Sequence, residues 1–199
     1  MPLVYRYAFP GIWLAWAVYW LYASRGNKPS ERREPAVSRL LHILPLMLVV
    51  WLLWSDRVPV AFLNERAYPW APWEFWIGLS ITAIGLLFTV WARVHLGRNW
   101  SGVVTIKQGH DLIDTGPYSL VRHPVYTGLL IAFIGSAMAR GEWRGVLAVL
   151  IAWAALWRKL RFEEGWMIER FGERYIAYSR RVPALLPLRN RSKHETDGA

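Results

Sequence analysis

One apolar block constrains the fold of this chain more than any other feature. Residues 73–96 read WEFWIGLSITAIGLLFTVWARVHL, in which only Glu74 and Arg93 carry full charges. A helix needs about 20 mostly apolar residues to cross the hydrocarbon core of a bilayer, so this block is long enough to span it. Four shorter apolar runs accompany the block, at residues 8–23, 40–54, 124–139 and 143–157. The pattern predicts an all-α, polytopic integral membrane protein with about five transmembrane helices.

Positive charge is distributed unevenly among these runs. The chain has 199 residues and a formal net charge of +10, which by itself would also fit a nucleic-acid binder. However, 18 of the 24 Lys and Arg residues lie in three alternate segments, at residues 24–39, 97–122 and 158–199. Such alternation is the positive-inside pattern of membrane proteins, and binding to nucleic acid does not require it. We therefore expect the N-terminus outside, the C-terminus in the cytoplasm, and no nucleic-acid partner.

The same reading divides the chain into three regions. Residues 1–96 are expected to hold the N-terminal transmembrane helices, and residues 191–199 a disordered tail. Residues 97–190 are expected to form the cofactor-binding catalytic region. Within it, the short break Arg140-Gly141-Glu142 separates two apolar runs, which predicts a helical hairpin made by the last two helices.

Cysteine is absent from the sequence, which excludes several kinds of site. The chain can form neither a disulfide nor a zinc–thiolate centre, and it has no Cys nucleophile. The HExxH pattern of zinc proteases is also missing. We therefore expect no metal cofactor.

The first candidate site lies where a polar segment meets the fourth apolar run. Arg122 and His123 directly precede Pro124, a favourable first residue for a helix. A helix N-terminus attracts anions, and Tyr118 and Tyr126 lie on either side of it. The residues alone leave two interpretations open: a ligand site, or a basic loop that contacts lipid phosphate.

Glu163 and Glu164 mark the second candidate site, because they follow the last apolar run on the same expected face of the membrane. Acidic groups at a membrane interface are costly unless paired, so Arg122 is the expected partner of one of them. Adjacent residues on a helix face about 100° apart, and the spacing does not decide which glutamate points inward. We favour Glu163. An ordinary solvated helix of Glu–Arg pairs is the alternative.

Together the two motifs resemble the isoprenylcysteine carboxyl methyltransferase family, part of a wider membrane methyltransferase superfamily that includes phospholipid methyltransferases. The resemblance covers about half of the chain, roughly residues 96–188. It rests on the following residues: Arg122-His123-Pro124-Val125-Tyr126-Thr127-Gly128, Glu163-Glu164, Phe171-Gly172, Tyr175, Tyr178 and Val182-Pro183.

The resemblance implies S-adenosylmethionine as cofactor, in a cytoplasm-facing pocket between the last two helices and the loop before them. It implies Arg122, near the substrate carboxylate, and Glu163 as the catalytic residues. It also implies a set of cofactor-binding residues: His110, Leu112, Tyr118, His123, Pro124, Tyr126 and Glu164.

The expected function is methyl transfer to a lipophilic acceptor that enters from the bilayer, with the carboxylate of a prenylated cysteine as the acceptor. Such a carboxylate is already ionised at neutral pH, so the reaction needs no general base. The alternatives are a phospholipid or small-thiol methyltransferase, an NADPH-dependent sterol-type membrane reductase, and a non-catalytic scaffold or transporter. The expected location is the inner membrane of a prokaryote or the endoplasmic reticulum of a eukaryote.

Overall fold

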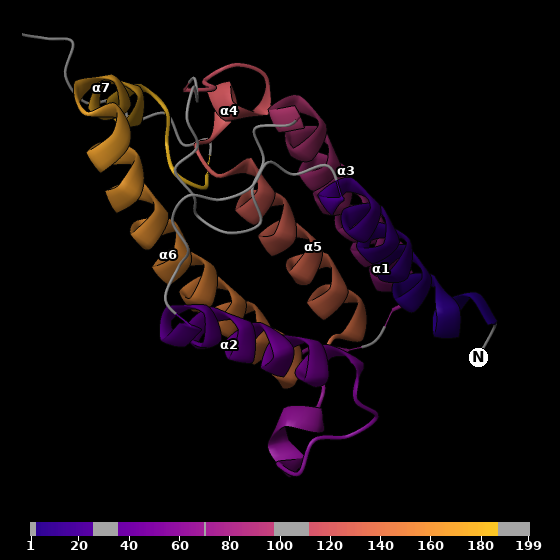
Figure 1. Ribbon diagram of the computed structural model, residues 1–199. Helices are drawn as coiled ribbons and strands as arrows, with labels where there is room; N and C mark the ends of the chain where they lie inside the picture. The colour runs from indigo at the N-terminus through magenta and orange to yellow at the C-terminus, as the bar shows by residue number, and fades with distance from the viewer. Residues whose placement is uncertain (1–2, 26–35, 70, 98–111, 187–199) are drawn as a thin grey trace, which may run out of the picture.

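A computed structural model describes residues 3–25, 36–69, 71–97 and 112–186. His110 and the expected tail at residues 191–199 lie outside these ranges. The described residues form helices and no strand, as predicted (Figure 1). The elements are α1 (Leu3–Ser24), α2 (Ala36–Trp54), the short 3₁₀ helix η1 (Ala61–Asn64), α3 (Pro72–Leu96), α4 (Pro117–Leu120), α5 (Pro124–Arg140), α6 (Trp143–Phe171) and α7 (Glu173–Arg181).

Each of the five apolar runs lies within one of the five long helices. In the described part of the chain, α2 from Val37 onward and α3 are long and apolar enough to cross a membrane, and α5 is a shorter apolar helix. The helices α5 and α6 are joined by a two-residue turn in which Gly141 has a φ of 67°. They pack against each other, so the expected hairpin is present. That five helices cross the membrane stays a prediction.

The centre of the fold is the antiparallel pair α3 and α5, whose backbones touch at two places. A Cβ atom added to Gly85 would lie 2.5 Å from the carbonyl oxygen of Gly128, and one added to Gly78 would lie 2.5 Å from that of Gly135. Each helix places its two glycines seven residues apart, which is about two turns and therefore one face. Small residues allow helices in membranes to approach this closely. The fully buried Thr82 Oγ1 adds a hydrogen bond of 3.2 Å to the carbonyl of Ala132.

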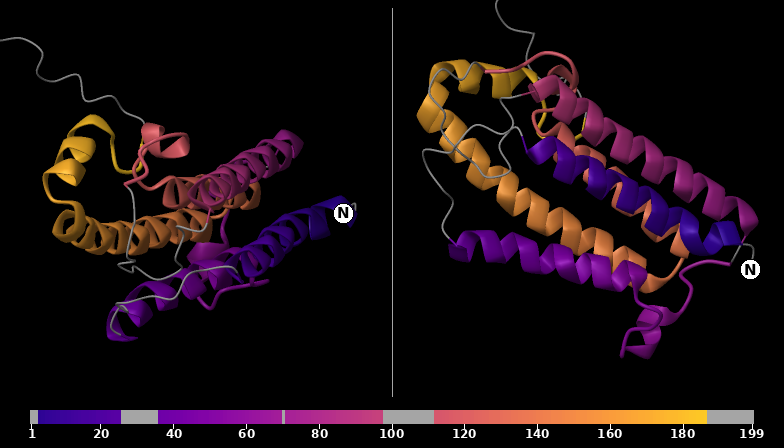
Figure 2. Two further views of the ribbon diagram at one scale, coloured as in Figure 1. Left: turned by 45° about the horizontal axis from the view of Figure 1, so that its top comes forward. Right: turned by 45° about the vertical axis from the view of Figure 1, so that its right-hand side comes forward.

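Two tryptophans fasten α1 to this pair. The Trp13 indole donates a hydrogen bond of 3.1 Å to Ser136 Oγ, and its ring stacks on Phe133 with the centroids 5.1 Å apart. The Trp16 indole donates one of 2.7 Å to Thr89 Oγ1. Figure 2 shows α1 lying along α3 on one side of the molecule, and α2 lying along α6. These two tryptophans therefore join α1 to α3 and α5.

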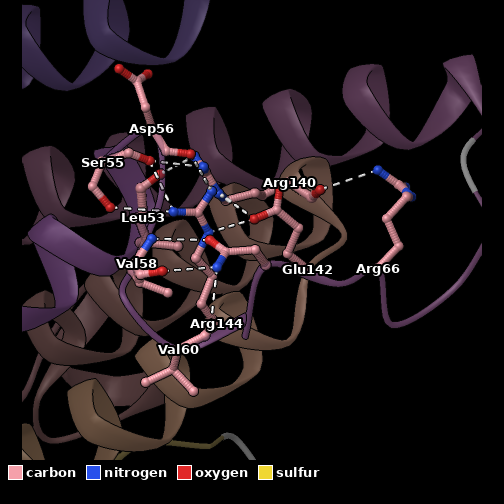
Figure 3. Close-up of polar contacts among 10 residues, drawn as sticks. Leu53, Ser55, Asp56, Val58, Val60, Arg66, Arg140, Glu142 and Arg144 are labelled. Carbon is pink, nitrogen blue, oxygen red and sulfur yellow. Dashed lines mark hydrogen bonds and ion pairs between the residues drawn. The ribbon is translucent and has the colours of Figure 1, made fainter. Parts of the chain in front are cut away.

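Arginines close the end of the molecule that holds the α5–α6 turn (Figure 3). Arg144 is only 1% exposed, and it donates hydrogen bonds to carbonyl oxygens at the C-terminus of α2, as Arg140 also does. Cations are favourable at a helix C-terminus because unpaired carbonyls carry partial negative charge there. Glu142 forms ion pairs with both arginines. The contacts join the end of α2 to the hairpin, and their acceptors are the carbonyls of Leu53, Ser55 and Asp56.

The opposite end of the molecule gathers the residues of both sequence motifs. The C-terminus of α3, the short α4, the N-terminus of α5, the last turns of α6 and all of α7 meet there (Figure 1). After α7 the chain turns back toward the start of α5. There the amide of Arg122 donates to the carbonyl of Pro183 at 2.8 Å, and the amide of His123 to that of Ala184 at 3.1 Å. The two motifs are thus brought into direct contact.

Candidate functional site

The side chain of Arg122 is engaged on all three of its nitrogens. Its Nε donates a hydrogen bond of 2.8 Å to Glu164 Oε1, and its Nη2 contacts the same oxygen. Its Nη1 donates to the carbonyls of Ser179, at 2.9 Å, and Val182, at 2.6 Å. These two carbonyls lie at the C-terminus of α7, where a cation is favourable. Arg122 therefore binds groups of the chain itself with all three nitrogens.

Glu164 is the buried member of the glutamate pair, with 8% of the whole residue exposed. Besides Arg122, it has His123 Nε2 at 3.4 Å and the Tyr175 hydroxyl at 3.4 Å. Burial alone would raise the pKa of its carboxyl. The nearby His123 imidazole and Arg122 guanidinium outweigh the burial and lower the pKa to about 2. Glu164 therefore stays ionised and holds Arg122 in place.

Glu163 faces a different group of partners. It accepts a hydrogen bond of 2.5 Å from the Tyr126 hydroxyl, and its other oxygen lies 3.7 Å from His123 Nδ1. Its side chain is 21% exposed, against 11% for that of Glu164. The rings of His123 and Tyr126 stack in parallel, with centroids 5.6 Å apart. A carboxylate beside stacked ring faces is an environment that attracts cations.

Lys159 completes what we call the site cluster. Its ammonium lies over the Tyr126 ring, 5.9 Å from the centroid. Sequence reasoning did not single out this lysine, although its position four residues before Glu163 places both on one face of a helix. The members of the site cluster are Arg122, His123, Tyr126, Lys159, Glu163 and Glu164.

The remaining expected site residues are placed around this cluster. The carbonyl of Tyr118 accepts a hydrogen bond of 2.6 Å from the Tyr178 hydroxyl, and burial raises the pKa of the Tyr118 phenol. Pro124 is buried as the first residue of α5. Leu112 is half-buried in the segment before α4. None of the described contacts joins Leu112 to the cluster.

His95, near the end of α3, reaches the segment that carries Tyr118. Its Nε2 lies 2.9 Å from Thr115 Oγ1, and its ring stacks against that of Tyr118 at 6.4 Å. It also lies against Gly116, where an added Cβ would come within 2.6 Å of the imidazole and where φ is 57°. His95 thus fixes the turn that leads into α4. Sequence reasoning had no pattern that would link the two segments.

The described residues contain no group of three or more His, Asp or Glu side chains that could hold a metal ion. The arrangement instead offers two carboxylates, two stacked rings and a half-buried ammonium. Such groups can bind charged organic molecules and hold them in a fixed relative orientation.

A family model described as phospholipid methyltransferase matches residues 73–174. The matched region begins at the start of α3 and ends at the first residues of α7, so it includes the whole site cluster.

Individual relatives add two kinds of names. The chain is 27% identical to protein-S-isoprenylcysteine O-methyltransferase B of Arabidopsis thaliana, over 62% of this chain and 66% of the relative. It is 33% identical to protein-S-isoprenylcysteine O-methyltransferase of Mus musculus, over 57% of this chain and 45% of the relative. It is also 32% identical to the cobalt-zinc-cadmium resistance protein CzcN of Cupriavidus metallidurans, over 66% of this chain and 61% of the relative. The chain therefore spans about half to two thirds of the length of these relatives.

Proposed function

The chain belongs to the phospholipid methyltransferase family, and from this premise we propose that it moves a methyl group from S-adenosylmethionine to a lipophilic acceptor in a membrane. The observation that carries the proposal is the contact of Glu163 with the stacked pair His123 and Tyr126. The proposed acceptor is the carboxylate of a prenylated cysteine, because several relatives are named protein-S-isoprenylcysteine O-methyltransferase.

The residues of the site cluster fit a positively charged methyl donor. When bound, S-adenosylmethionine supplies an electrophilic methyl group on a sulfonium, and it also carries an ammonium. Glu163 has the more exposed carboxylate of the pair and lies against ring faces, so it is the proposed ligand for one of these cations. The other proposed cofactor-binding residues are Leu112, Tyr118, His123, Pro124 and Tyr126, together with His110, which lies outside the described ranges. Glu164 is instead proposed as a positioning residue, because it is the ion-pair partner of Arg122.

The chain has a modest chemical task with a carboxylate acceptor. The acceptor oxygen forms its bond to the methyl carbon as the carbon–sulfur bond breaks, and the electron pair of that bond stays on sulfur. No proton is transferred, because the acceptor is already ionised. The site has to align the two reactants and exclude water, and alignment of this kind can lower a barrier by roughly 7–11 kcal/mol in favourable cases.

Arg122 serves this task indirectly in our proposal. It holds Glu164 on α6 and the end of α7 against the start of α5, which fixes the neighbouring His123 and Glu163. Glu163 remains the proposed catalytic residue, and Arg122 becomes a positioning residue.

A phospholipid is the second candidate acceptor, because the matching family model is described as phospholipid methyltransferase. An amine acceptor would have to lose a proton, so a base would be required. His123 lies 3.7 Å from one oxygen of Glu163 and is the group placed to accept that proton.

We further propose that residues 1–96 act as transmembrane helices and residues 97–190 as the catalytic region. The site would face the cytoplasm, because the basic segments predict that side. The membrane would be the inner membrane of a prokaryote or the endoplasmic reticulum of a eukaryote.

Ligand stabilisation of the purified chain in detergent tests the proposed donor. S-adenosylhomocysteine should raise its melting temperature, since a ligand that binds only the folded state stabilises it. NADPH should leave the melting temperature unchanged. Stabilisation by NADPH and not by S-adenosylhomocysteine would support the reductase alternative and overturn the proposal.

A further inference from the structure

Lys159 lies on the inward face of α6, an unusual place for a lysine. One turn earlier on the same face, Ala155 and Leu156 are 5% and 2% exposed, and α6 packs against α5. One turn later, the face carries Glu163 and the site cluster. Lys159 itself is half-buried, and lysine is a rare residue on a helix face that packs against another helix. Lys159 therefore occupies the point where the apolar interface gives way to the site.

The contacts of the cluster show which basic side chain can accept a new partner. Arg122 is engaged on all three nitrogens, and His123 lies between Glu163 and Glu164. Lys159 lies over the Tyr126 ring and forms no ion pair with a carboxylate among the described residues. Its ammonium has three hydrogen-bond donors. The Tyr126 ring attracts the ammonium by its π-electrons, so these donors remain available for an anionic partner.

We propose that Lys159 binds an anionic oxygen of the methyl acceptor, an inference that rests on the proposed function and specifies its acceptor. A carboxylate and a phosphate offer this oxygen equally well, so the proposal names the shared charge. A neutral acceptor such as a small thiol would gain nothing from Lys159.

The relative positions of Lys159 and Glu163 give this binding a consequence for catalysis. The two residues are four apart on one helix, so they lie about one turn, roughly 5–6 Å, along its axis from each other. Glu163 would hold a cation of the donor while Lys159 holds an anion of the acceptor. The anionic group of the acceptor would thereby be held about one helical turn from the cation of the donor.

The test compares Lys159→Gln with two matched variants in the full chain. Lys159→Arg keeps the charge, and Arg161→Gln removes one charge from an exposed position on another face of the same helix. The measurements are the KM for S-adenosylmethionine and the KM for farnesylcysteine and for phosphatidylethanolamine. Farnesylcysteine binding is also measured without any methyl donor, by the shift in melting temperature.

We expect Lys159→Gln to raise the KM of whichever anionic acceptor the wild type uses by about tenfold or more, because a charge-assisted hydrogen bond is lost. The KM for S-adenosylmethionine should change less than twofold, Lys159→Arg should retain most of the affinity, and Arg161→Gln should resemble wild type. Weaker binding of farnesylcysteine without donor should accompany a raised KM for it. Methylation of farnesylcysteine alone or of phosphatidylethanolamine alone would identify the carboxylate or the phosphate as the ligand.

Three results would overturn the inference. The first is an active wild type together with a Lys159→Gln variant whose KM for the acceptor changes less than twofold. The proposed function would then stand, but Lys159 would not bind the acceptor. Another is an equal effect of Arg161→Gln, which would indicate a general charge effect. The third is a wild type that methylates neither acceptor, which would remove the proposed function and this inference together.

Discussion

Arg122 Nε donates a hydrogen bond of 2.8 Å to Glu164 Oε1, across 42 positions of the sequence. The adjacent Glu163 accepts instead from the hydroxyl of Tyr126, which lies on α5. Two neighbouring carboxylates therefore reach different partners, one in a structural ion pair and the other beside stacked rings. The distinction assigns different duties to two residues whose spacing does not decide which one points inward. The sequence favoured Glu163 as the inward residue, whereas Glu164 is the more buried of the two.

Replacement of each glutamate by glutamine should separate these duties. Glu164→Gln leaves Arg122 without its carboxylate, and loss of one member of a buried pair costs about 3–5 kcal/mol. We expect a clear fall in melting temperature for Glu164→Gln. For Glu163→Gln we expect a near-native melting temperature and weaker stabilisation by S-adenosylhomocysteine. The reverse pattern would show that the two roles are exchanged.

The ion pair itself can be measured with a double-mutant cycle. Arg122→Ala and Glu164→Gln should each destabilise the protein, while the double variant should lose clearly less than the sum, by more than about 1 kcal/mol. Arg122→Ala should still lower the stability of the Glu164→Gln variant, because the carbonyls of Ser179 and Val182 also lose their hydrogen-bond donor. Additive losses would contradict a direct pair.

Acid should expose the contribution of Glu164. Its pKa is lowered from 4.5 to about 2 in the folded protein, so the folded state binds fewer protons than the unfolded state in that range. The stabilisation is complete above about pH 4.5 and is lost as the pH falls toward 2. Melting temperatures recorded in detergent from neutral pH downward should therefore fall more steeply for wild type than for Glu164→Gln. Parallel profiles would indicate that Glu164 does not titrate with folding.

The sequence predicted the helices and the motif residues because both depend on local patterns. Apolar runs of sufficient length predicted the all-α membrane fold, and the Arg122-His123 and Glu163-Glu164 motifs predicted the parts of the site. A pairing of Arg122 with one of the glutamates was also expected, from the cost of an unpaired charge at an interface.

The rest depends on how distant segments meet, which no local pattern states. The binding of Arg122 to the carbonyls of Ser179 and Val182 requires the chain to turn back after α7. The importance of Lys159 depends on its ammonium lying over the ring of Tyr126, a residue of another helix. The glycine contacts between α3 and α5 could have been predicted, because the two glycines of each helix are seven residues apart in the sequence. A search for apolar runs does not detect this spacing.

Those glycine contacts predict a marked difference between two Gly→Ala substitutions. Gly85→Ala places a methyl group 2.5 Å from the Gly128 carbonyl oxygen, so the helices must separate, at a cost of roughly 1–3 kcal/mol. Gly165→Ala in α6 meets no atom within 4 Å and should be neutral or stabilising by up to roughly 1 kcal/mol. Melting temperatures of the two variants check this, and equal values would contradict a close contact at Gly85.

Methyl transfer by the purified chain tests the central claim most directly. The wild-type protein is incubated with S-adenosylmethionine labelled in its methyl group and, separately, with farnesylcysteine, phosphatidylethanolamine and a small thiol. We predict label in the lipophilic anionic acceptor, with farnesylcysteine preferred, and its loss in Glu163→Gln. Absence of label from all three acceptors, in a protein that is folded by its melting transition, would contradict the claim that this chain is a membrane methyltransferase.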